Sequence, residues 1–220
     1  MKKIIFIVFV IFTVLFIYSL NAKEKIYYAS IGDHLSYGIN NFNRINNSYS
    51  DNIKKYYKNS LNNYVNYSNI NDYRVTDLIS DINYNKVVKF KNHEYKLQNI
   101  LVKANLITLS IGMNDIITKK NITYDYVDSV LKEIDNLFKI IRKYNKDKIY
   151  FLGFYDVINN KKIIEYANRR AEKICIKNKI NYVNIEKLSD YIISDIYPTD
   201  DGYKYITDQV FTLLKSKIIV

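Results

Sequence analysis

The sequence predicts a single α/β domain with a mostly parallel sheet, and two observations support this fold class. First, short runs of β-branched and aromatic residues alternate with stretches whose apolar residues recur at helical spacing, the pattern of repeated βα units. Second, 220 residues with 48% hydrophobic and 15% aromatic side chains can bury one sizeable core and are too apolar for a disordered chain. No linker or internal repeat divides residues 23–220, so we expect one domain there.

Residues 1–22 differ from the rest and have the pattern of a targeting segment. Lys2 and Lys3 precede an apolar run from Ile4 to Leu20, and the charged Lys23 follows. The run is long for a cleaved signal peptide and short for a membrane span, so we expect either a signal peptide or an N-terminal membrane anchor. Both alternatives predict an exported protein, either extracellular or anchored to the outer face of the cytoplasmic membrane.

The remaining chain predicts five strands and three long helices. The strands are expected at Lys25–Ser30, Tyr64–Ile70, Asn105–Ile111, Lys148–Tyr155 and Asn181–Ile185. The helices are expected at Tyr124–Tyr144, at Lys161–Lys179 and at about Asp201–Lys215. The polar stretch Ile39–Ser50 predicts a loop, and Lys86–Gln98 predicts an inserted hairpin or a lid.

The composition excludes several kinds of site and partner. Cys175 is the only cysteine, which excludes a disulfide framework, a CxxC redox pair and a cysteine-rich zinc site. His34 and His93 are the only histidines, so neither a His-rich metal site nor a cofactor is expected. The formal charge of +11 accompanies a general excess of residues with A/T-rich codons, so we expect no nucleic-acid partner. The charge would favour contact with an anionic surface of the cell envelope.

Three segments contain polar residues at the edge where open parallel sheets bind their ligands. Two of them follow the first and third expected strands, and the last lies just before the final helix. The segments are Ser30–Gly38 (SIGDHLSYG), Ser110–Asp115 (SIGMND) and Ser194–Tyr203 (SDIYPTDDGY). They contain four of the five glycines and the only proline of the chain. Taken singly, each segment is also explained by a helix N-cap or by an Asn/Asp turn.

Together and in this order, the segments resemble the motif blocks of the SGNH (GDSL-type) hydrolase superfamily of esterases and lipases. Residues 32–38 (GDHLSYG) resemble its first block, GDSLSxG, and residues 71–78 (NDYRVTDL) its second, SGYRTxDLL. Residues 112–115 (GMND) match its third block, GxND, and residues 197–203 (YPTDDGY) are similar to its last, HPNxxGY. The resemblance covers residues 25–215 and implies a flavodoxin-like, three-layer α/β/α sandwich with a parallel sheet of about five strands.

The departures from these blocks fall on the catalytic positions that the resemblance implies. The aligned residues are His34 for the serine nucleophile, Asp72 for an oxyanion-hole glycine, Asn114 for the asparagine and Tyr197 for the histidine base. The position of the acid falls on Ser194, or on Asp195 if the loop is one residue shorter. Only the asparagine keeps its residue type.

These departures predict a protein with impaired catalysis. A serine attacks an ester only when a neighbouring base takes its proton, and a tyrosine, whose reference pKa is about 10, stays protonated at neutral pH. A carboxylate at Asp72 would face and repel the developing oxyanion. We therefore expect an exported SGNH-like protein that binds an acyl or carbohydrate-type ligand in a pocket edged by His34, Asp72, Asn114 and Tyr197. The expected partner is a small molecule, a lipid or a carbohydrate of the cell envelope.

The alternative is an active esterase, lipase-type or acetyl-transfer enzyme with a rearranged constellation of His34, Ser36 and Asp195. Ser36 would be its nucleophile, although its side chain, two residues beyond His34, is expected to point in another direction. His34 itself would be a second choice of nucleophile, oriented by Asp195 or Asp72. His34, Asp72 and Asp195 are also compatible with a cation site, but their residue types do not distinguish such a site from a polar pocket. His93 is expected on the surface or in the lid.

Overall fold

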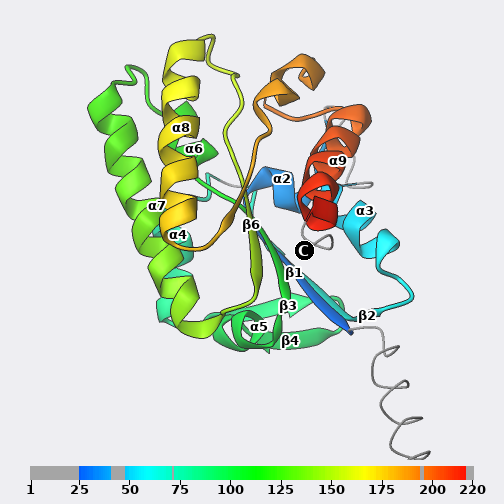
Figure 1. Cartoon of the computed structure of the whole chain (residues 1–220). Helices are drawn as coiled ribbons and strands as arrows, with labels where there is room; N and C mark the ends of the chain where they lie inside the picture. The colour runs from blue at the N-terminus through cyan, green and yellow to red at the C-terminus, as the bar shows by residue number, and fades with distance from the viewer. Residues whose placement is uncertain (1–24, 41–47, 71, 194–195, 217–220) are drawn as a thin grey trace, which may run out of the picture.

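The structure is a computed structural model that describes residues 25–40, 48–70, 72–193 and 196–216 (Figure 1). The expected targeting segment, residues 1–22, lies outside these ranges, and so do Ser194 and Asp195. Within the described ranges, no helix has both the length and the hydropathy that crossing a bilayer requires.

A five-stranded parallel sheet forms the centre of the domain. Its strands are β1 (Ile26–Gly32), β2 (Leu61–Ser68), β5 (Leu106–Ser110), β6 (Lys148–Leu152) and β7 (Asn181–Val183). They lie in the order β2-β1-β5-β6-β7, and each strand is parallel to its neighbours. The five predicted strands are confirmed, and their order is that of a flavodoxin-like sheet.

Helices cover both faces of the sheet, so the domain has three layers (Figure 1). One layer contains α4 (Val75–Asn83), α7 (Tyr124–Tyr144) and α8 (Lys161–Lys177), with α5 (Leu97–Lys103) packed beside α4 and α7. The other contains α2 (His34–Tyr37), α3 (Tyr49–Tyr56) and α9 (Asp200–Ser216). The short helix α6 (Met113–Ile117) follows β5, and the 3-10 helix η1 (Glu186–Tyr191) follows β7. The three predicted helices are confirmed, with ends that differ by at most two residues.

The inserted segment forms an antiparallel hairpin of β3 (Val87–Phe90) and β4 (His93–Lys96). The hairpin lies at the amino ends of the parallel strands (Figure 1), where Phe90 packs edge-on against Tyr64 of β2 with 5.5 Å between ring centres. The predicted hairpin is therefore confirmed. The alternative of a lid is wrong, because the hairpin follows the far end of α4 and the candidate site lies at the opposite edge. His93 is exposed on this hairpin.

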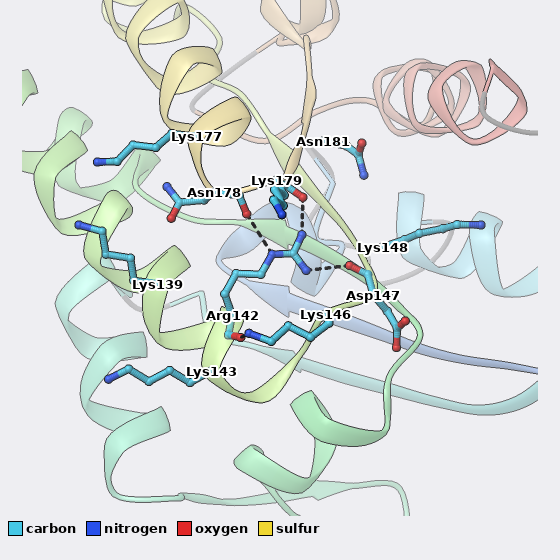
Figure 2. A pocket seen from close by; sticks show the side chains of 10 residues that line it. All are labelled: Lys139, Arg142, Lys143, Lys146, Asp147, Lys148, Lys177, Asn178, Lys179 and Asn181. Carbon is cyan, nitrogen blue, oxygen red and sulfur yellow. Dashed lines mark hydrogen bonds between the residues drawn. The ribbon is translucent and has the colours of Figure 1, made fainter. Parts of the chain in front are cut away.

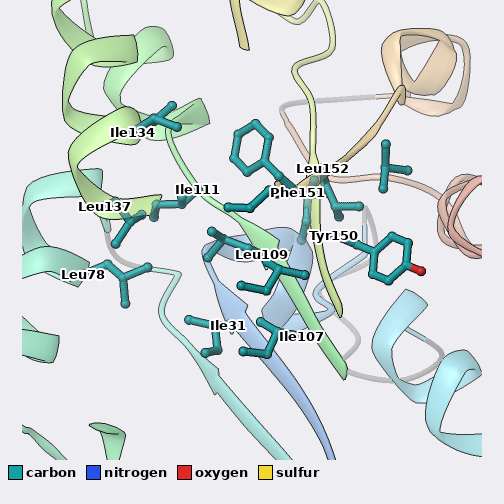
Figure 3. Close-up of a cluster of buried hydrophobic side chains, with 14 of the residues drawn as sticks. Ile31, Leu78, Ile107, Leu109, Ile111, Ile134, Leu137, Tyr150, Phe151 and Leu152 are labelled. Atoms are coloured by element: carbon teal, nitrogen blue, oxygen red, sulfur yellow. The ribbon is translucent and has the colours of Figure 1, made fainter. Parts of the chain in front are cut away.

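The face of the sheet that α4 and α7 cover is apolar. Ile107 and Leu109 of β5 are fully buried there, in a cluster with Ile134 and Leu137 of α7 (Figure 3). Phe151 of the next strand extends this cluster, with its ring 5.2 Å from that of Phe138. Burial of such side chains, at about 25 cal/mol per Å² of apolar surface, is the main stabilising term of the fold.

The face toward α3 contains buried hydroxyl groups instead. Thr108 and Ser110 alternate with the apolar residues of β5, so their side chains point to this second face. The Thr108 hydroxyl lies 2.7 Å from the hydroxyl of Tyr28, and the Ser110 hydroxyl lies 2.9 Å from that of Ser36. Tyr49 of α3 joins this network at 2.8 Å from Ser36. Each of these five hydroxyls therefore has a partner, as is usual for buried polar groups, whereas the buried hydroxyl of Tyr150 has none among the described residues.

Candidate functional site

The loops after β1 and β5 are held together at the carboxyl edge of the sheet. Gly32 has φ +143°, and a Cβ atom on it would lie 1.8 Å from the carbonyl oxygen of Ser110. The next residue, Asp33, donates its backbone N–H to the same carbonyl at 2.8 Å. Only glycine permits this close approach of two backbones, so the glycine of the first block fixes where α2 begins.

His34, in the first turn of α2, is at the centre of the candidate site. Its side chain is 1% exposed, and its Nε2 lies 2.7 Å from the hydroxyl of Tyr155, just after β6. Tyr155 donates its only proton to the carbonyl of Ile196 at 2.8 Å. The phenol oxygen therefore accepts the hydrogen bond from His34, which places a proton on Nε2. Tyr155 was not predicted as a site residue, although it is the last aromatic residue of the strand segment that ends at this edge.

Tyr197 contacts the same imidazole from another side. The two rings meet edge-on, with 5.8 Å between their centres, and Tyr197 is half-buried. The structure therefore brings together the residues at the predicted nucleophile and base positions. Ser194 and Asp195, the two candidates for the acid, lie outside the described residues.

Asp33 is a second residue of the site that was not predicted as a site residue. It does cap α2, since Oδ1 accepts a bond from the backbone N–H of Leu35 at 3.2 Å, and it also accepts one from the Ser110 hydroxyl at 2.8 Å. The same oxygen lies 3.9 Å from Nδ1 of His34. Among the described residues, its buried Oδ2 has no hydrogen-bond partner. Burial raises the pKa of this carboxyl group, and the neighbouring His34 opposes the shift.

Ser36 does not form a catalytic pair with His34. Its hydroxyl is fully buried and lies 3.0 Å from the carbonyl oxygen of Ile31, 2.8 Å from the Tyr49 hydroxyl and 2.9 Å from the Ser110 hydroxyl. It belongs to the hydroxyl network under the site and points away from His34.

Asn114 and Asp115, at the start of α6, connect the third block to the second. Asn114 is buried and donates from Nδ2 to the carbonyl of Tyr73 at 3.0 Å. Asp115 accepts a bond from the backbone N–H of Val75, the first residue of α4, at 3.2 Å. Burial raises the pKa of Asp115 to about 6, and the bond from Val75 limits the shift. The Asn-Asp pair therefore positions the second block.

Asp72 is not oriented as the sequence predicted. Its carboxylate pairs with Arg74 at 2.9 Å, and its side chain is 55% exposed. It therefore does not lie against His34. Its backbone has φ +46°, a conformation that glycine adopts without cost, so this position keeps the backbone shape of a glycine while having a side chain.

The arrangement contains hydrogen-bond donors and buried acids, and the serine–carboxylate contact within it joins Ser110 to Asp33. No serine among the described residues is bonded to a histidine. These residues also contain no group of three His, Cys, Asp or Glu side chains placed to hold a metal ion. Two of the three residues compatible with a cation site have other partners, because the carboxylate of Asp72 pairs with Arg74 and His34 is bound to Tyr155. The third, Asp195, lies outside the described residues.

Comparisons with known proteins agree on the fold. No model of a known protein family matches the sequence, and no curated protein does. A variant of Axe2, an acetyl-xylooligosaccharide esterase from Geobacillus, superposes with a TM-score of 0.64 at 13% identity, over 86% of this chain and 94% of its own. A member of the lipolytic G-D-S-L family from Veillonella parvula gives 0.61 at 13% identity, over 86% and 97%. TesA gives 0.63 at 14% identity, over 86% and 98%. The protein therefore has the fold of the SGNH hydrolases, as its four sequence blocks indicate.

Proposed function

We propose that this protein is exported, that it has lost ester hydrolysis by the serine mechanism, and that it binds a carbohydrate or acyl group at the carboxyl edge of its sheet. The observation that carries the proposal is the environment of His34. At the position of the nucleophile stands a buried imidazole whose Nε2 proton is bound to Tyr155.

The chemistry of the surrounding groups supports the loss of hydrolysis. A nucleophile needs a base that accepts its proton, and the ring next to His34 at the position of the base is the phenol of Tyr197 instead of an imidazole. The nearby hydroxyl of Ser36 is bonded to three other groups in the core. Loss of a single oxyanion-hole donor costs serine hydrolases about 100- to 1000-fold in rate. Here the residues at the positions of the nucleophile and of the base both differ, which should cost at least as much.

A polar pocket at the carboxyl ends of β6 and β7 supports carbohydrate binding. It has a volume of about 850 Å³ and lies between the loops that follow β6 and β7 and helix α9. Its lining contains carboxylates, amides and one aromatic ring, from Asp156, Asn159, Asn184, Glu186, Asp190, Tyr205 and Gln209. Carboxylates and amides accept and donate bonds to sugar hydroxyls, and a tyrosine ring packs on the apolar face of a sugar. A long acyl chain would leave these polar groups without partners.

Two assays on the purified protein test this proposal. Turnover of an aryl acetate and labelling by a fluorophosphonate measure hydrolysis, and we expect neither. Calorimetric titration with acetylated xylooligosaccharides, the substrate class named for Axe2, measures binding, with a fatty-acyl probe as the comparison. The variants Asp190→Asn and Gln209→Ala should weaken sugar binding by about tenfold each. Asp147→Asn, at the opposite edge, is the matched control and should leave binding unchanged.

The alternative of an active enzyme with a rearranged constellation makes the opposite predictions. Turnover that is lost in His34→Ala or Ser36→Ala would contradict the proposed loss of hydrolysis. Binding of the acyl probe but not of the sugars would contradict the assignment of the pocket.

A further inference from the structure

A strongly basic pocket lies at the amino edge of the sheet, opposite the candidate site. Its volume is about 860 Å³, and it is lined by six lysines and one arginine against a single aspartate (Figure 2). The lining residues come from the end of α7, the start of β6, the end of α8 and the start of β7. The carboxyl ends of two helices therefore meet here.

Arg142 holds these segments together and has a structural role. Its Nε donates to the carbonyl of Asn178 at 3.0 Å, and Nη1 donates to that of Asp147 at 2.8 Å. Nη2 bonds to the carbonyl of Lys179. The guanidinium group thus binds backbone carbonyls at the end of α8 and before β6, and the lysines are arranged around it (Figure 2).

Four of the six lysines form no ion pair with a carboxylate among the described residues. Lys139 and Lys177 both pair with Asp135, at 2.7 and 3.0 Å. The other four are exposed, and they are Lys143, Lys146, Lys148 and Lys179. Two helix ends together carry a partial charge equal to about one negative charge. The helix dipoles therefore account for only part of this positive cluster, which retains an excess of charge.

An exposed apolar side chain lies beside the cluster. Ile176, in the last turn of α8, is 71% exposed and directly precedes Lys177. An apolar side chain next to several lysines is the combination found on surfaces that contact a bilayer, where the lysines meet headgroups and the apolar group enters the interface. If the pocket instead bound the phosphates of a nucleic acid, the exposed apolar side chain of Ile176 would have no apolar partner.

The register of the sheet places this cluster close to the beginning of the described chain. Tyr28 of β1 pairs with Leu106 of β5, which pairs with Lys148 of β6. Since neighbouring strands are about 4.8 Å apart, Lys148 lies about 10 Å across the sheet from Tyr28, two residues after the start of β1. Residues 23–25, the link between the apolar segment and β1, span at most about 10 Å when extended. A membrane anchor at residues 1–22 would therefore hold this edge near the headgroups.

We propose that the basic pocket, together with Ile176, docks the domain on the anionic phospholipid headgroups of the membrane in which residues 1–22 are anchored. The inference rests on the proposed export of the protein, with residues 1–22 retained as a membrane anchor, and is independent of ligand binding at the other edge. Docking turns the amino edge of the sheet to the membrane and leaves His34 and the polar pocket facing away from it.

A single-tryptophan experiment on the full chain tests the docking surface, because the native sequence has no tryptophan. The variant Ile176→Trp places a fluorophore beside the lysines. Ile193→Trp, at the opposite edge and 72% exposed, is the matched control. Each protein is reconstituted in vesicles of brominated phosphatidylcholine, with and without phosphatidylglycerol. We expect quenching of Ile176→Trp in the anionic vesicles, much weaker quenching in neutral ones, and none of Ile193→Trp.

Charge reversal then identifies the groups responsible. Lys143→Glu, Lys146→Glu and Lys148→Glu, combined with Ile176→Trp, should lower the ratio of docked to undocked domain by roughly a hundredfold. The same number of reversals at Lys161, Lys162 and Lys187 should have little effect. Equal quenching in both lipids, or at Ile193→Trp, would overturn the proposal. Binding of an oligonucleotide by the domain, combined with no quenching in anionic vesicles, would also overturn it and would assign the pocket to a soluble polyanion.

Extraction with carbonate separates this inference from the proposal on which it rests. Protein that resists extraction but shows no quenching would overturn the docking surface alone. Protein that is released would overturn the anchored arrangement. Neither result depends on whether the polar pocket at the other edge binds sugars.

Discussion

The Nε2 atom of His34 lies 2.7 Å from the hydroxyl oxygen of Tyr155, and both residues are buried. Because Tyr155 also binds the carbonyl of Ile196, the contact connects the segments that follow β1 and β6 to the start of the last sequence block. The imidazole at the nucleophile position is thus a structural connection between three loops.

Removal of the Tyr155 hydroxyl should destabilise the protein. In Tyr155→Phe, the buried Nε2–H of His34 and the carbonyl of Ile196 lose their bonds to the phenol, so we expect the free energy of unfolding to fall by about 1 to 3 kcal/mol. Unfolding in urea measures this change. Tyr84→Phe is the control, because Tyr84 is 85% exposed, and an equal loss in both variants would contradict the bridging role.

Two glycine substitutions separate backbone strain from a steric clash. Gly32 and Gly112 both have a positive φ, but an added Cβ would lie 1.8 Å from a backbone carbonyl oxygen at Gly32 and 3.1 Å from the flexible end of Ile134 at Gly112. We expect Gly112→Ala to cost about 1 to 3 kcal/mol of stability, and Gly32→Ala to cost more. Thermal and urea unfolding would show the order, and equal costs would contradict the close approach of β1 and β5.

The carboxyl group of Asp115 should make stability depend on pH. Burial raises its pKa in the folded state to about 6, above the unfolded value near 4. The folded state therefore favours the protonated form, and this stabilisation is present below the unfolded pKa and is lost as pH rises to about 6. Asp115→Asn has no carboxyl group to titrate, so its unfolding free energy should not fall over this range. Its stability relative to the native protein should therefore be about 2 to 3 kcal/mol higher above pH 6 than below pH 4.

Asp135 provides the control of opposite sign. Although partial burial opposes the shift, bonds from Lys139, Asn178 and Lys177 lower its pKa to about 2. Its contribution to stability is therefore present above the unfolded pKa and is lost as pH falls toward 2. For each variant, unfolding in urea measures the difference in unfolding free energy from the native protein as a function of pH. This difference should rise with pH for Asp115→Asn and fall with pH for Asp135→Asn. A change of the same sign in both variants would contradict the opposite pKa shifts of the two carboxyl groups.

Restoration of the family residues should produce measurable hydrolysis. The combined variant His34→Ser, Asp72→Gly and Tyr197→His places a hydroxyl next to an imidazole and returns glycine to a backbone with φ +46°. We expect turnover of an aryl acetate above that of the parent and fluorophosphonate labelling at position 34. The double variant without His34→Ser is the control. A well-folded triple variant with no labelling would contradict the alignment of the blocks.

The sequence predicted all five strands of the parallel sheet because each contains a short run of β-branched and aromatic residues. It also predicted the long helices. In α7, for example, 21 residues give many repeats of the helical spacing of apolar side chains. Helices α3, α4 and α5 have only seven to nine residues, so their periodicity is too short to distinguish from loops. Tertiary packing determines these segments.

The candidate site could be predicted only in part. The sequence blocks located His34, Asn114 and Tyr197, because strand ends and glycine turns fix where backbone segments meet. They did not locate the hydrogen bond to Tyr155, which depends on the rotamer of a residue 121 positions away. The direction of the Asp72 carboxylate was also predicted wrongly, since an exposed side chain follows its nearest opposite charge, here Arg74.

The buried hydroxyls on the α3 side of the sheet make its two sides chemically distinguishable while the chain is folding. If β5 rotated by half a turn, Thr108 and Ser110 would enter the apolar layer beside α7 and lose their partners Tyr28 and Ser36. Each uncompensated hydroxyl would cost about 1 to 3 kcal/mol. Such an error would cancel a large part of the stability of a domain of this size. The hydroxyl network therefore disfavours a sheet in which β5 presents its hydroxyls to α7. It thereby determines which face of the sheet each layer of amphipathic helices packs against.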